Sequence, residues 1–170
     1  QYIDSETETI DSMNNLIDWL PKNLPSEKRT GIVHGDYSLT NVMIGKNDPN
    51  VIAILDWELS TLGDPCADFN YHCLQYTMNP KLADKAYCKN QGIPVIDDYV
   101  KMYSEKINID LTEEWDLYSA YNLFKLAGIL QGILGRVRDG TAAHENAAER
   151  ASGVRNLSDT AWGLVQKNFL

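Results

Sequence analysis

The first part of the chain has the spacing of apolar residues that is typical of an amphipathic helix. Within residues 4–21 the apolar side chains recur at steps of three and four, at Ile10, Met13, Leu16, Ile17 and Leu20. One face of a helix repeats at this spacing, so these side chains are expected to share a buried face. Proline does not fit a helix interior, and we expect Pro21 to end the helix and a loop to follow over residues 21–31.

Three short runs of aliphatic residues come next and predict β-strands. They lie around residues 32–33, 42–44 and 51–55. The turn sequence GKNDPN, residues 45–50, separates the second run from the third and predicts a hairpin. The middle of the chain is therefore expected to form a small β-ribbon.

The remainder of the chain favours helices. Residues 63–78 predict a helix that Asp64 caps and Pro65 opens, because proline lacks the N–H group that would be unpaired at the first helical position. Apolar spacing predicts further helices over 93–107, 112–138 and 142–168, the last with a break near Gly153. The expected class is α+β, mostly helical with a short β-ribbon.

Composition and charge narrow the class of protein. A chain of 170 residues with 44% hydrophobic residues can build one domain or one lobe of a larger fold. No apolar run is long enough to span a bilayer, and the net charge of −9 argues against a nucleic-acid partner. Cys66, Cys73 and Cys88 show no zinc-ligand or CxxC spacing. We expect reduced core thiols and a cytoplasmic location.

Polar residues that could take part in catalysis or metal binding interrupt the β-ribbon. The sequence HGDYSLTN, residues 34–41, carries His34, Asp36 and Asn41 before the second strand, and Asp56 directly follows the third. A hairpin would bring Asn41 and Asp56 to one point, where an amide oxygen and a carboxylate suit Mg²⁺. Asp36 could then accept or orient the proton of a substrate hydroxyl group. A polar turn in which Asp36 and Asn41 only bond the nearby backbone is the alternative.

The flanking residues have supporting roles in this hypothesis. Gly35 permits a backbone shape that a bulkier residue would resist. His34 is expected to hold the loop by hydrogen bonds and not to touch the substrate. The pattern of His34, Asp36 and Asn41 resembles the catalytic loop of kinases.

Two motifs together carry a resemblance to a family. HGDYSLTN followed by ILDWELSTLGDPCAD, residues 54–68, resembles the aminoglycoside phosphotransferase family of kinase-like enzymes. The stretch LDWELSTLGDP is most similar to the kinase-type domains associated with acyl-CoA dehydrogenases, and the resemblance is strong over residues 31–76. It implies a protein-kinase-like fold, ATP as the phosphoryl donor and Mg²⁺ as the metal. In that fold this chain would be the C-terminal lobe.

The resemblance assigns roles to the motif residues. It implies that Asp36 is the catalytic aspartate, and that Asn41 and Asp56 bind the Mg²⁺ of the nucleotide. Trp57 stands where the kinase DFG motif has phenylalanine, and Glu58 stands where it has glycine. Glu58 would either assist a second metal ion or form a nearby salt bridge, and we favour the salt bridge.

Asp68 and Asp64 lie further along the same motif. Asp68 resembles the buried aspartate that braces the catalytic loop from the following helix. Asp64 is interpreted as the cap of that helix, since Pro65 follows it.

The N-terminal lobe of a kinase-like fold is not visible in the sequence. Before His34 there is one predicted helix and a loop, with no strand lysine and no glycine-rich phosphate loop. We therefore expect residues 1–170 to form the C-terminal lobe alone, with weak nucleotide binding, negligible turnover in isolation and an apolar patch where the missing lobe would pack.

The leading functional hypothesis is transfer of the γ-phosphate of ATP to the hydroxyl group of a small molecule. A hydroxyacyl-CoA is the favoured acceptor, with Arg136 and Arg138 placed to meet its phosphates. An aminoglycoside or another cationic alcohol is the alternative acceptor. A non-catalytic kinase-like binding module and a metal-dependent hydrolase are the other two classes considered. The sequence leaves the acceptor and the oligomeric state open.

Overall fold

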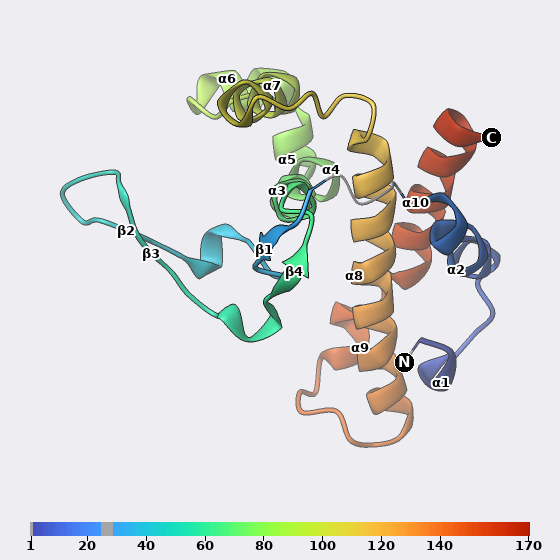
Figure 1. The fold of residues 1–170 in the computed structure, drawn as a ribbon. Coiled ribbons are helices and arrows are strands. Elements are labelled where there is room, and N and C mark those ends of the chain that lie inside the picture. The colour runs from blue at the N-terminus through green and yellow to red at the C-terminus, as the bar shows by residue number, and fades with distance from the viewer. Residues whose placement is uncertain (1, 25–28) are drawn as a thin grey trace. The chain divides into compact units, whose positions relative to one another are not determined.

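The computed structural model describes residues 2–24 and 29–170 (Figure 1), so part of the predicted 21–31 loop lies outside the described residues. The chain divides into two units. The first comprises Gln1–Pro25 and Ser119–Leu170, and the second comprises Ser26–Tyr118. Among the described residues, we find no helix with both the length and the apolar character needed to cross a membrane.

Helices build the first unit. They are α1 (Tyr2–Ser5), α2 (Asp11–Asn23), most of α8 (Trp115–Arg138), α9 (Ala147–Arg150) and α10 (Val154–Phe169). Helix α2 packs on α10, and the side chains of Met13 and Leu16 are fully buried. The three- and four-residue spacing therefore identified the buried face of α2. The predicted break near Gly153 is confirmed, because this residue lies between α9 and α10.

The predicted bounds of the first helix were wrong at both ends. Residues 4–21 do not form one helix, since α1 ends at Ser5 and α2 begins only at Asp11. Pro21 does not stop α2, which continues to Asn23 with the proline inside it. Proline is tolerated here because it lies in the last turn, where its missing N–H group costs one helical hydrogen bond and the Leu24 N–H still reaches the Leu20 carbonyl at 3.0 Å.

Two small antiparallel sheets lie in the second unit. The predicted hairpin is present, with β2 (Val42–Ile44) paired to β3 (Val51–Ile54). The first predicted strand, β1 (Gly31–Val33), pairs instead with β4 (Thr61–Gly63), which the sequence analysis did not predict. The middle of the chain thus forms two ribbons and not one, and β4 was missed because Thr61–Gly63 contains only one aliphatic residue.

Helices also make up much of the second unit. They are α3 (Cys66–Cys73), α4 (Gln75–Met78), α5 (Pro80–Ala83), α6 (Lys85–Asn90), α7 (Ile96–Ile107) and the start of α8. Phe69 of α3 stacks on Tyr103 of α7 with ring centroids 3.8 Å apart. The predicted helix over 63–78 is divided at Leu74, and α5 and α6 were not predicted. All three cysteines are free and buried, as expected.

Candidate active site

The loop between β1 and β2 has a backbone conformation that requires glycine. Gly35 has φ of +87°, and a Cβ atom at this position would lie 2.5 Å from the carbonyl oxygen of Leu59. The loop therefore passes directly against the 3₁₀ turn Trp57–Leu59. A side chain at Gly35 would push these two segments apart.

His34 fixes this loop from within, as predicted. Its side chain is buried, with 3% of its surface exposed. Nδ1 accepts a hydrogen bond from the backbone N–H of Asp36 at 3.2 Å, and Nε2 lies 2.8 Å from the carbonyl oxygen of Leu55. Because Nδ1 accepts, the ring proton must be on Nε2, which donates to Leu55. His34 thus joins the loop to the end of β3.

Asp68 holds the same loop from helix α3. Its carboxylate accepts the backbone N–H of His34 through Oδ2 and that of Gly35 through Oδ1, the second at 3.0 Å. Two backbone donors in a turn that no strand pairs are satisfied in this way. The bracing contact predicted for Asp68 is therefore present in the structure.

Asp36 and Asn41 contact one another across the loop. The side-chain nitrogen of Asn41 donates to the backbone carbonyl of Asp36 at 2.9 Å and to its Oδ2 at 3.1 Å. Because the amide nitrogen is used in this way, the amide oxygen of Asn41 is the atom that could face a metal ion. Asn41 thus orients the Asp36 carboxylate and also closes the loop, which is the role that the polar-turn alternative gave it.

Tyr71 of α3 also reaches Asp36, and the sequence analysis missed it. Burial of the Tyr71 hydroxyl group, together with the negative charge of Asp36 and a hydrogen bond to it, raises the pKa of Tyr71 to about 12. The available signal was its position three residues after Asp68, which places both side chains on one face of the helix. It could be used only once Asp68 had been assigned to the loop.

The hairpin brings the backbone of Asn41 to the end of β3, where Asp56 lies, and a metal site shared by the two side chains stays a prediction. The Leu55 N–H donates to the Asn41 carbonyl at 2.8 Å, so Asp56 directly follows the residue bonded to Asn41. Asp56 is exposed and has φ of +65°, a left-handed conformation that is uncommon for residues other than glycine and occurs often at functional sites. In the described part of the chain, no cluster of three or more His, Cys, Asp or Glu side chains could hold a metal ion.

Trp57 and Glu58 follow Asp56 in a 3₁₀ turn. The Trp57 ring lies 4.7 Å from the ring of His34, and its Nε1 donates to the Ile54 carbonyl at 2.8 Å. Trp57 therefore also contacts the loop through His34. The salt bridge favoured for Glu58 is not formed with any residue that the structure describes, and Glu58 is exposed.

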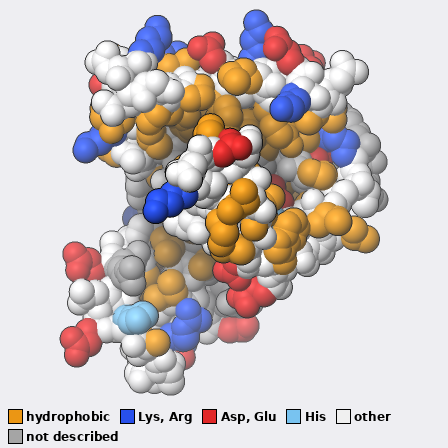
Figure 2. All heavy atoms as spheres, turned by 90° about the vertical axis from the view of Figure 1, so that its left-hand side faces the viewer, with side chains coloured by type: hydrophobic (Ala, Val, Ile, Leu, Met, Phe, Trp, Pro, Cys, Tyr) orange, Lys and Arg blue, Asp and Glu red, His pale blue; other side chains and the backbone are white. Residues whose placement is uncertain are grey.

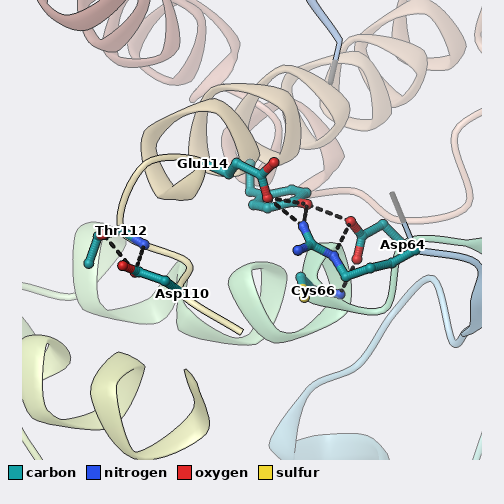
Figure 3. Close-up of polar contacts among 7 residues, drawn as sticks. Asp64, Cys66, Asp110, Thr112 and Glu114 are labelled. Atoms are coloured by element: carbon teal, nitrogen blue, oxygen red, sulfur yellow. Dashed lines mark hydrogen bonds and ion pairs between the residues drawn. The ribbon is translucent and has the colours of Figure 1, made fainter. Parts of the chain in front are cut away.

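A second polar cluster fixes the start of α3 (Figure 3). Asp64 accepts the Cys66 backbone N–H through Oδ1 at 2.9 Å, as a capping side chain does, but Pro65 lies just before the helix and not at its first position. Its Oδ2 accepts from Arg29 Nε at 2.9 Å and from the Tyr118 hydroxyl at 2.6 Å, and Arg29 also pairs with Glu114. Neither Arg29 nor its partners at the start of α8 were predicted, since they lie far from Asp64 in sequence.

This cluster changes the acidity of its members. Burial alone would raise the pKa of Asp64, but the hydrogen bonds from Tyr118, the Cys66 N–H and Arg29 outweigh burial and lower it. Burial and the neighbouring Asp64 carboxylate raise the pKa of Cys66 to about 12. Beside the cluster, Asp110 accepts the backbone N–H and the hydroxyl of Thr112 at 2.9 and 2.6 Å (Figure 3), which caps the turn before α8.

Arg136 and Arg138 lie near the end of α8 in the first unit, whereas the loop residues belong to the second unit. Arg138 pairs with Asp139 at 2.8 Å and donates to the Glu6 carbonyl at 3.0 Å. The side chain of Arg136 is exposed. A role of the two arginines at the candidate active site stays a prediction.

Apolar side chains are exposed around the two ribbons of the second unit. Figure 2 views the side that carries the β2–β3 hairpin and shows hydrophobic side chains gathered at the surface. The exposed apolar residues of these segments are Ile32, Leu39, Met43, Ile44, Val51, Ile52, Leu55, Trp57, Leu59 and Leu62. We call this set the ribbon surface. Single exposed apolar residues are ordinary, whereas large exposed apolar groups are typical of surfaces that another chain covers.

Comparison with known proteins identifies a family and several similar proteins. The profile of the phosphotransferase enzyme family matches residues 1–121. Mouse acyl-CoA dehydrogenase family member 10 is 37% identical over 98% of this chain, and human acyl-CoA dehydrogenase family member 11 is 33% identical over 99%. The chain spans only 16% and 22% of the length of these two relatives.

A solved structure is similar over almost the whole chain. It is the crystal structure of a candidate aminoglycoside phosphotransferase from Ralstonia eutropha JMP134, with a TM-score of 0.90 and 41% sequence identity. The match covers 99% of this chain and 53% of that protein. The chain thus spans about half of that structure.

Proposed function

Because this chain belongs to the phosphotransferase enzyme family, we propose that it is the catalytic C-terminal lobe of a kinase that transfers the γ-phosphoryl group of ATP to a hydroxyl group of a small molecule. The observation that carries the proposal is the Asp36 carboxylate, which Asn41 holds within a loop fixed by His34 and Asp68. A loop held by side chains from three directions presents Asp36 in one orientation, as catalysis of phosphoryl transfer requires.

Asp36 is proposed to meet the acceptor. Its carboxylate would accept a hydrogen bond from the acceptor hydroxyl group, orient it for in-line attack on the γ-phosphorus, and take its proton as the new O–P bond forms. His34 is not available for this step, since both of its ring nitrogens bond the backbone. In this proposal His34 is a positioning residue.

Asn41 and Asp56 fit a Mg²⁺ ion. Together they offer an amide oxygen and a carboxylate at adjacent positions of the hairpin, and Mg²⁺ is commonly held by one or two such protein groups with phosphate and water oxygens completing its shell. When bound, the ion would neutralise the charge of the transferred phosphoryl group. The side-chain nitrogen of Asn41 would keep its bond to Asp36 at the same time.

The ribbon surface supports the proposal of a further lobe. About half of the Ralstonia eutropha protein lies outside the match to this chain, and a lobe that packs on the ribbon surface would cover side chains such as Ile52 and Leu62. In this proposal ATP is held between the two lobes, and the isolated 170 residues bind it weakly.

The identity of the acceptor is the least supported part of the proposal. A hydroxyacyl-CoA is favoured by the names of the two mammalian relatives, whereas a cationic alcohol is favoured by the name of the solved structure. Arg136 is the better candidate for CoA phosphates, since Arg138 already pairs with Asp139. The free, buried cysteines are consistent with a reducing compartment such as the cytoplasm.

Replacing Asp36 tests the proposed function. In the full-length protein that contains this chain, Asp36→Asn should lower kcat with Mg-ATP by on the order of 10²- to 10⁴-fold and leave the KM for ATP nearly unchanged. The measurement is transfer of ³²P from labelled ATP to 3-hydroxybutyryl-CoA and to kanamycin. The matched control is Asp98→Asn, an exposed carboxylate on α7. A variant with the wild-type rate would exclude Asp36 as the catalytic aspartate and favour a binding module.

A further inference from the structure

One face of helix α3 contacts the candidate catalytic loop. Asp68, Tyr71 and His72 lie at positions i, i+3 and i+4 of the helix and therefore project from the same side. Asp68 bonds the backbone of His34 and Gly35, on one side of Asp36.

The next turn of this face reaches the other side of Asp36. The His72 ring lies 5.7 Å from the ring of Tyr37, the residue that follows Asp36. His72 is held in turn by the Tyr99 hydroxyl at 3.3 Å. Tyr71 lies between Asp68 and His72 on this face, and a hydrogen bond to Asp36 is among the causes that raise its pKa.

We propose that Tyr71 is a positioning residue of the phosphotransferase, whose hydroxyl group donates to the Asp36 carboxylate and, with the side-chain amide of Asn41, sets its orientation toward the acceptor. This inference rests on the proposed function of Asp36. A carboxylate has room for about four hydrogen bonds, so two donors from the protein leave space for the acceptor hydroxyl group. The hydrogen bond from the Tyr71 hydroxyl group restrains rotation of the carboxylate. It uses only one lone pair, so others remain for the acceptor hydroxyl group.

The acidity of Tyr71 agrees with a permanent donor. Burial and the nearby Asp36 charge raise the pKa of Tyr71 to about 12, so the hydroxyl group keeps its proton at physiological pH. The other titratable groups of this face are Asp68 and His72, and the hydroxyl-bearing Tyr37 of the loop and Tyr99 of α7 pack against His72. Burial lowers the pKa of His72, so it adds no positive charge beside Asp36 at neutral pH.

The kinetic test replaces only the hydroxyl group. In the full-length protein, Tyr71→Phe should lower kcat for ³²P transfer by about 10-fold, the value of one hydrogen bond to a charged group, with the KM for ATP unchanged. Tyr76→Phe is the matched control, since that hydroxyl donates to the Pro94 carbonyl on the surface.

A spectroscopic test does not need turnover. The side-chain amide of Asn41 donates to the Asp36 carboxylate, so its ¹⁵N–¹H signals report the state of that carboxylate. In protein labelled with ¹⁵N-asparagine, Tyr71→Phe should shift these signals and Tyr76→Phe should not.

The outcomes separate this inference from the proposed function. Wild-type kinetics and unshifted Asn41 signals in Tyr71→Phe would overturn the role of Tyr71, whereas a loss of activity in Asp36→Asn would still support the proposed function. If the wild-type protein transfers no phosphate to either acceptor, the proposed function loses its support. The Asn41 signals then decide whether Tyr71 holds Asp36.

Discussion

Each unit of this chain has an apolar core, but the candidate catalytic loop of the second unit is held in a different way. In the helical first unit, α2 and α10 bury continuous apolar faces, and residues such as Met13, Leu16 and Val165 are fully enclosed. In the second unit, the loop with Asp36 owes its shape to a few polar contacts from His34 and Asp68. Apolar packing distributes stability over many contacts, whereas a polar loop depends on each one. The orientation of Asp36 therefore depends on a few individual hydrogen bonds, whereas the fold of the first unit depends on many apolar contacts together.

The largest effect is expected from opening the core of the first unit. Leu16→Ala should lower the free energy of unfolding by about 2–5 kcal/mol, because it removes a fully buried side chain and leaves a cavity. Urea denaturation followed by circular dichroism measures this change. Ile52→Ala, on the exposed ribbon surface, is the control and should change stability by less than about 0.5 kcal/mol in the 170-residue chain. Equal losses in the two variants would remove the contrast between the units.

Breaking the brace of the loop should have the next largest effect. Asp68→Asn replaces one of two accepting oxygens by a donor that faces a backbone N–H group, and we expect a loss of about 2–3 kcal/mol. Hydrogen exchange should accelerate at the amides of His34 and Gly35 while the amides of α2 keep their protection. Asp48→Asn, in the exposed hairpin turn, serves as the control. Unchanged exchange at the two loop amides would contradict the bracing role.

The Arg29 cluster offers a smaller, pH-dependent effect. The folded chain lowers the pKa of Asp64 below its usual value of 3.8, so ionised Asp64 stabilises the fold above about pH 4. That contribution is lost as the pH falls through the lowered pKa. Arg29→Met leaves Asp64 and Glu114 without their cation and should cost about 2 kcal/mol at pH 7, since all three side chains are only partly buried.

Thermal denaturation between pH 2.5 and pH 7 measures this dependence. Wild-type protein should lose stability more steeply below pH 4 than Arg29→Met does, because the variant has less to lose when Asp64 becomes protonated. Lys85→Met removes the exposed pair with Asp97 and should leave the profile almost unchanged. Identical profiles for wild type and Arg29→Met would show that the cluster does not stabilise the second unit.

The smallest effect concerns the thiol groups. Burial raises the pKa of Cys66 and of Cys73 to about 12 each, so neither forms an appreciable thiolate at pH 8. Iodoacetamide should therefore alkylate native protein slowly, and urea should bring the rate to that of a free cysteine. Mass spectrometry of the peptides distinguishes the two sites. Rapid labelling of native Cys66 would mean that the Arg29 cluster opens easily.

Several elements could be predicted from residue spacing alone. The apolar period identified the buried face of α2, the turn sequence at 45–50 identified the β2–β3 hairpin, and the motif residues pointed to Asp36 and Asn41. Each of these signals lies within a few residues along the chain. The prediction for Pro21 was wrong because the free-energy cost of a proline depends on where it lies in the helix. That position follows from where α2 ends, which the residue type alone does not reveal.

Contacts between segments that are far apart in the sequence became visible only in the tertiary structure. Pairing of β1 with β4 and the meeting of Arg29 with Asp64 and Glu114 have no sequence signal of their own, and the position of Tyr71 is informative only once Asp68 is known to hold the loop. A hydrogen bond or an ion pair forms only when folding has placed both partners within about 3 Å, and many polar residues of the same types remain exposed. The sequence could therefore name the catalytic loop, whereas only the fold could show which side chains hold it in place.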